Sequence, residues 1–133
     1  MLLLASPAHA QFFEAVCSPS RDRLIKNQLD CIFMQQQYLQ FKAMPESMIR
    51  VGVRSSDARI RSAALAAAGD RKLSMRDEFV ARLTDESQLV RQVARRNLVL
   101  LTRRDFGPMP CCTKEEAAAS QELWRAWFEE PYR

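Results

Sequence analysis

The stretch from Leu83 to Arg104 constrains the fold more than any other part of the chain, because its apolar residues recur at helical spacing. Side chains that accept hydrogen bonds from the free amides of a helix start precede it, from Thr84 to Ser87. The stretch therefore predicts a short amphipathic helix entered through a capped turn. The residues expected on one arc, about 160° wide, are Val90, Val93, Ala94, Asn97, Leu98, Leu100 and Leu101.

A shift of 30 residues superposes this stretch on an earlier copy of itself. The earlier copy departs from this stretch where Ser55 stands in the place of Asp85 and Ala68 in the place of Leu98. Ser55 cannot offer Arg61 a charge, which weakens the case for a continuous series of Asp–Arg pairs. We expect two helical repeats, at about 44–72 and 73–104. The superposed pairs are Ile49 and Phe79, Val53 and Leu83, Ile60 and Val90, Arg61 and Arg91, and Ala64 and Ala94.

The pattern L-x-D-x-x-x-x-V-R-x-x-A-x-x-x-L-x-x-L resembles a HEAT repeat, including those of the PBS-lyase type. The resemblance implies a bond between Asp85 and Arg91, and close helix packing at Ala94. It also implies a short α–α superhelix, which agrees with an all-α domain of five to six antiparallel helices. The residues that carry the resemblance are Leu83, Asp85, Val90, Arg91, Ala94, Leu98 and Leu101.

The segments on either side of the repeats are predicted to cover them, since two repeats are too few for a stable stack. Residues 11–43 form an N-terminal cover helix whose stripe includes Leu29, Ile32 and Leu39. Residues 105–133 form a linker and a C-terminal capping helix, in which Phe106 acts as an apolar plug. Thr113 and Glu116 match a capping box, Ser74 to Asp77 match a variant of one, and Trp124, Trp127 and Phe128 are expected in the core.

Residues 1–10 look like the remnant of a secretory signal peptide, because Ala8-His9-Ala10 fits the small-x-small cleavage pattern. We therefore expect a periplasmic or secreted protein, with a cytoplasmic one as the alternative. No run approaches the ~20 apolar residues of a membrane span.

The four cysteines allow three pairings in an oxidising compartment. Adjacent Cys111 and Cys112 would close a strained ring, and a bridge from Cys17 to Cys31 needs a distorted helix entry. We expect Cys17 or Cys31 to pair with Cys111 or Cys112. The alternative is four reduced thiols.

Catalysis and cofactor binding are not expected. The only histidine, His9, would leave with the signal, so a Ser-His-Asp or Cys-His scheme lacks its base. No phosphate-binding glycine loop or zinc motif is present, and the cysteine spacing suits zinc poorly. The sequence predicts no enzyme, no cofactor and no metal site.

Charge is uneven along the chain, since residues 44–104 hold thirteen Arg or Lys against seven acids. Arg61, Arg91 and Arg95 are candidates for a stripe that faces an anionic partner. The favoured function is a non-catalytic protein-binding or scaffold module with an acidic protein partner. The alternative is a HEAT domain that binds nucleic acid through arginines, and a lyase-like accessory subunit is a weaker third.

Overall fold

The computed structural model describes residues 28–130, and within them the chain is helical, with no strand. The predicted all-α fold is confirmed. The proposed signal remnant, the start of the cover helix and Cys17 lie outside the described residues. The elements are α2 (Gln28–Phe41), α3 (Glu46–Val53), α4 (Ala58–Asp70), α5 (Arg76–Ala81), the 3-10 helix η1 (Arg82–Thr84), α6 (Gln88–Thr102) and α7 (Lys114–Glu129).

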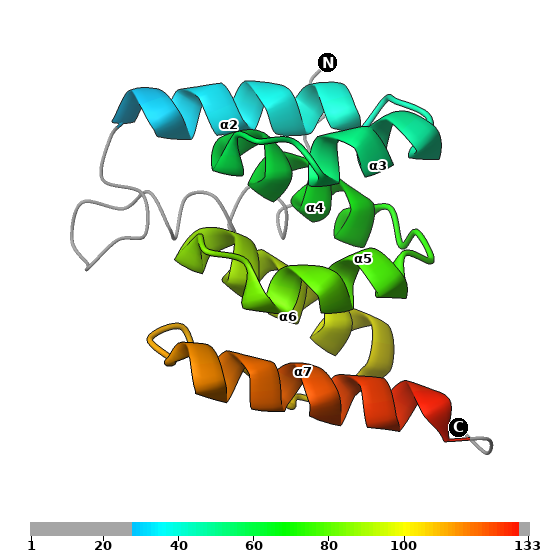
Figure 1. Cartoon of the computed structure of the whole chain (residues 1–133). Coiled ribbons are helices and arrows are strands. Elements are labelled where there is room, and N and C mark those ends of the chain that lie inside the picture. Colours follow the sequence, from blue (N-terminus) through cyan, green and yellow to red (C-terminus); the bar gives the residue numbers. More distant parts are fainter. Residues whose placement is uncertain (1–27, 131–133) are drawn as a thin grey trace.

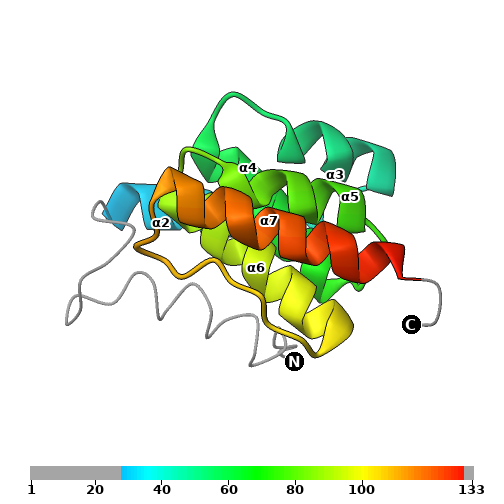
Figure 2. The same ribbon diagram turned by 60° about the horizontal axis from the view of Figure 1, so that its bottom comes forward.

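The helices lie in successive layers, from α2 at the top of Figure 1 to α7 at the bottom. In between, α4 contacts α2, α3 and α6, and α6 also contacts α5 and η1. Figure 2 brings α7 to the front, where it runs across the layer below it and contacts η1 and α5. The paired helices α3–α4 and α5–α6 thus form the centre, and α2 and α7 cover its two sides.

Positions that the 30-residue shift superposes are buried alike in the two halves. Ile49 and Phe79 are both almost fully buried, as are Val53 and Leu83. At the centre of α4 and α6, Ala64 and Ala94 are both inaccessible to solvent. Both side chains are small, which is compatible with close packing of α4 on α6, the role expected of Ala94.

The residues that cap the starts of α4 and α6 are also 30 positions apart. Asp57 caps α4 by accepting the Arg59 amide, and Ser87, 30 positions later, caps α6 by accepting the Val90 amide. Thr113 and Glu116 form the complete reciprocal capping box predicted for α7. The variant predicted at Ser74 to Asp77 is wrong, because Met75 is the cap of α5 and makes no side-chain bond.

The predicted buried stripe of the cover helix is also wrong. Leu29, Ile32 and Leu39 are exposed, whereas the core side of α2 consists of Cys31, Met34, Tyr38 and Phe41. This helix carries apolar residues all round, so its sequence periodicity does not select a face. Its contacts with α4 make the selection, and Tyr38 donates a hydrogen bond of 2.6 Å to Asp70 there.

The segment after α6 packs as an apolar plug, as predicted. Phe106 meets Trp124 edge to face, with ring centroids 4.8 Å apart, and the Trp124 indole donates to the Gly107 carbonyl oxygen at 2.9 Å. Trp124 is fully buried, while Trp127 and Phe128 are half-buried. The expectation of a core stripe in α7 therefore holds fully for one of the three aromatic residues.

Candidate functional site

In the turns before α4 and α6, a backbone carbonyl oxygen accepts a hydrogen bond from the arginine of the helix that follows. Arg61 donates through Nη1 to the Ser55 carbonyl oxygen at 2.9 Å, and Arg91 donates in the same way to the Asp85 carbonyl oxygen at 2.8 Å. The Ser55 hydroxyl accepts the amide two residues later, and so does the Asp85 carboxylate. Serine at position 55 therefore performs the local function of Asp85 without a charge.

The expected side-chain bond between Asp85 and Arg91 is wrong. The Asp85 carboxylate accepts two hydrogen bonds from Arg61, at 3.0 Å from Nε and 2.8 Å from Nη2. Both side chains are more than nine-tenths buried in this bidentate pair, which joins the two repeats. Arg91 reaches only the backbone of the turn, through the carbonyl oxygens of Asp85 and Glu86.

The stripe of Arg61, Arg91 and Arg95 does not form an open basic face. Arg61 is 6 % exposed and neutralised by Asp85. Arg95 makes a bidentate pair with Asp105, and this contact lowers the pKa of Asp105 below its usual value. Sequence spacing put the three arginines on one side of stacked helices, but it could not reveal which carboxylates the neighbouring segments bring to them.

The predicted disulfide between the N-terminal and C-terminal segments is wrong. Cys111 and Cys112 carry free thiols, and they lie in the loop before α7. Cys31 is disulfide-bonded. Because α2 and the loop before α7 lie on opposite sides of the central helix pairs, a bridge between them would have to span these layers.

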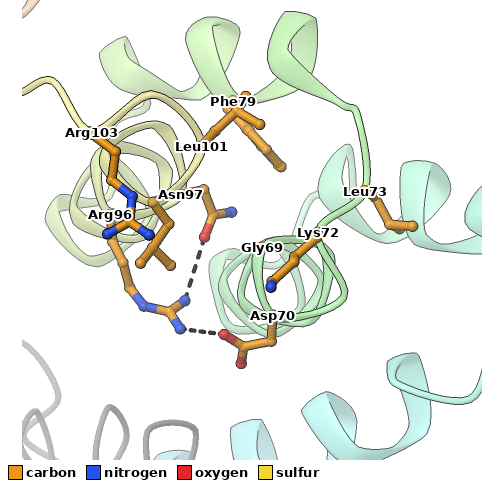
Figure 3. Close-up of a pocket in the computed structure, with 10 residues that line it drawn as sticks. Gly69, Asp70, Lys72, Leu73, Phe79, Arg96, Asn97, Leu101 and Arg103 are labelled. Atoms are coloured by element: carbon orange, nitrogen blue, oxygen red, sulfur yellow. Dashed lines mark hydrogen bonds and ion pairs between the residues drawn. The ribbon is translucent and has the colours of Figure 1, made fainter.

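A groove of about 600 Å³ lies where α4 and α6 end. Figure 3 looks into it and shows Arg96 and Arg103 on the side of α6 and Lys72 just after the end of α4. Its apolar lining consists of Leu73, Phe79, Leu100 and Leu101, and its polar lining of Gly69, Asp70, Lys72, Arg96, Asn97 and Arg103.

Close packing of α4 on α6 fixes the inner wall of the groove. Gly69 lies against Asn97 so closely that a Cβ would come within 2.0 Å of its side-chain oxygen. Asn97 is buried and donates to the Leu65 carbonyl oxygen at 2.7 Å, which ties the two helices together. Gly69 therefore serves the close approach to α6 and does not end the helix, because α4 continues to Asp70.

The last turn of α6 extends beyond the end of α4, and two of its leucines are therefore exposed to solvent. Leu100 is 51 % exposed and Leu101 is 44 % exposed, although both were expected on the buried arc. The other arc positions, from Val90 to Leu98, are buried as predicted. The helical wheel identifies the apolar side of α6, but it does not say how far a neighbouring helix covers that side.

Each helix that borders the groove is followed by a basic residue whose backbone has the left-handed conformation. Lys72 has a φ of 56° and Arg103 a φ of 62°, at places where glycine is usual. Their side chains are exposed and make no hydrogen bond or ion pair with any described residue. Asp70, the acid beside them, already accepts from Tyr38 and pairs with Arg96. Basic side chains therefore outnumber acidic ones at the mouth of the groove.

The described residues contain no group of three or more His, Cys, Asp or Glu side chains arranged to hold a metal ion. None of the helices in residues 28–130 is long and apolar enough to span a bilayer. We compared the chain with models of protein families, with curated proteins and with solved structures, and none of them matches it.

Proposed function

We propose that this chain is a non-catalytic protein-binding module, made of stacked helical repeats similar to HEAT repeats. Its groove at the ends of α4 and α6 receives an apolar side chain that is flanked by carboxylates in the partner protein. One observation carries the proposal. Exposed Leu100 and Leu101 lie in a single groove beside Lys72 and Arg103, which have no acid partner among the described residues.

The chemistry of the groove suits an apolar side chain that has carboxylates beside it. An exposed apolar lining gains free energy when a partner side chain covers it. The free carbonyl groups at the ends of α4 and α6 attract the two cations, but they leave the guanidinium and ammonium groups able to pair with carboxylates. An acidic partner was also the expectation from the basic excess of residues 44–104.

The similarity to HEAT repeats is supported by features that recur at a 30-residue interval: the capping residues, the buried positions and the bond from each arginine to its turn. We further propose that the protein is exported, as Ala8-His9-Ala10 suggests. Nucleic-acid binding and a lyase-like accessory role receive less support. The arginines of the candidate stripe bond to carboxylates or backbone oxygens within the chain and do not form an open face.

Selection from a displayed library of random peptides tests the proposal on the full chain. We expect the enriched peptides to combine a large apolar residue with neighbouring Asp or Glu. Their binding should weaken at least about tenfold in Leu101→Gln, which corresponds to about 1.4 kcal/mol. The matched control is Leu123→Gln, a change at a similarly exposed leucine of α7 outside the groove.

A second pair of changes tests the charge without harming the fold. Lys72→Gly and Arg103→Gly remove the cations at positions where glycine suits the left-handed backbone. We expect unchanged or higher stability together with weaker peptide binding that depends less on salt. Selected peptides without acids, or equal losses in the Leu101 and Leu123 variants, would remove this groove as the binding site.

A further inference from the structure

Arg61 and Arg91 lie 30 positions apart in the first turns of α4 and α6, yet among the described residues only Arg61 has a carboxylate partner. Each uses Nη1 to bond a carbonyl oxygen six residues earlier, as described above. Arg61 presents its other edge, Nε and Nη2, to both carboxylate oxygens of Asp85. In Arg91 the Nε atom is buried and has no hydrogen-bond acceptor among the described residues.

A buried donor without an acceptor is rare in folded proteins, and the chain itself indicates what fits this one. A carboxylate bound side-on satisfies Nε and Nη2 together, since the spacing of its oxygens matches that edge of the guanidinium. The Arg61–Asp85 pair is an example of this match in the same local backbone setting.

Arg91 borders a pocket of about 450 Å³ between the starts of α6 and α7. The hydroxyl-bearing Thr84 and Thr113 line the same pocket, and Lys114 adds a second cation. The acids on its wall are Asp85, whose carboxylate is engaged by Arg61, and the exposed Glu86. The pocket therefore has room and hydroxyl donors, and it adjoins the guanidinium group whose buried Nε is unpaired.

We propose that this pocket binds a carboxylate group, which is held side-on by Nε and Nη2 of Arg91 as Asp85 is held by Arg61. The site lies at the start of α6, at the opposite end of this helix from the leucine groove, and does not depend on that groove being occupied. The carboxylate comes either from a small acid or from an Asp or Glu side chain of a peptide.

Nuclear magnetic resonance of the arginine Nε–H groups in the full chain tests the proposal directly. Acetate, added at constant ionic strength, should shift the Arg91 signal along a saturable curve and leave Arg61 unchanged. Acetamide, which has nearly the same shape but no charge, should produce no such curve. A blocked aspartate peptide that saturates at lower concentration than acetate identifies a peptide side chain as the better ligand, and the reverse order identifies a small acid.

Two results in this titration would overturn the site. The first is a shift of Arg91 that grows linearly with acetate and is matched by chloride, because it reports ionic strength alone. The second is a saturable acetate shift of the Thr113 and Lys114 backbone amides that survives in Arg91→Lys, which keeps the charge but loses the two-donor edge.

A tethered carboxylate keeps the proposal testable if Arg91→Lys does not fold. Ala118 lines the pocket and its neighbour Ala119 does not, although both are exposed in α7. Ala118→Glu should abolish the acetate curve of Arg91 and raise the urea midpoint of unfolding above that of Ala119→Glu. Equal midpoints in the two variants, with the acetate curve intact in both, would count against the site.

Discussion

The carboxylate of Asp85 pairs with Arg61, 24 residues earlier in the chain, and not with Arg91 in its own repeat. The pair is buried, so it fixes the position of the second repeat on the first. Asp85 thus links the helix pair α3–α4 to the pair α5–α6, while its own backbone carbonyl accepts a hydrogen bond from Arg91.

We expect Asp85→Asn to lower the free energy of unfolding by about 3–5 kcal/mol, because it leaves the buried Arg61 cation without its counter-charge. Urea unfolding followed by circular dichroism measures the loss. Asp105→Asn is the matched control, since the Arg95–Asp105 pair is partly exposed and should contribute below about 1 kcal/mol. Similar losses in the two variants would contradict a structural role for the Arg61–Asp85 pair.

Leu98 and Leu101 belong to the same sequence motif but should differ in their contribution to stability. Leu98 is inaccessible to solvent, so Leu98→Ala should cost about 2–5 kcal/mol. Leu101 is 44 % exposed, and Leu101→Ala should cost about 0.5 kcal/mol or less. Thermal and urea melts of the two variants make the comparison. A large loss from Leu101→Ala would mean that another part of the protein covers the groove.

Alkaline pH should destabilise the fold through Tyr38. Burial, and secondarily the hydrogen bond to Asp70, raise the pKa of Tyr38 far above its usual value. The unfolded chain releases this proton near pH ~10, whereas the folded chain retains it, so the stability that Tyr38 contributes is lost as pH rises beyond that point. The free energy of unfolding should fall less steeply in Tyr38→Phe between about pH 9 and 11. Parallel slopes for the two proteins would rule out Tyr38 as the cause.

Freshly isolated protein should contain two reactive thiols, at Cys111 and Cys112, and a disulfide at Cys31. Alkylation without reductant, followed by peptide mapping, should label the peptide that contains the adjacent pair and leave Cys31 unlabelled. A labelled Cys31 in protein from the native host would contradict the disulfide and weaken the proposal of export.

The sequence by itself determined the local structure of the two helical repeats. Asp57 and Ser87 define where α4 and α6 begin, because their side chains satisfy amides only a few residues away. The period of apolar residues likewise identified the buried side of α6 as far as Leu98. Such features depend on interactions within one or two turns, and these can be inferred from spacing alone.

Only the tertiary structure decided which distant groups meet. The sequence suggested Arg91 as the partner of Asp85, but the packing of α4 against α6 brought Arg61 to its carboxylate. Helix α2 carries apolar residues on all sides, and its contact with α4 buries the side that contains Tyr38. Leu101 stays exposed to solvent because α4 ends too early to cover the last turn of α6. Pairing and burial depend on where neighbouring helices lie and end, and the periodicity of a single helix carries no information about either.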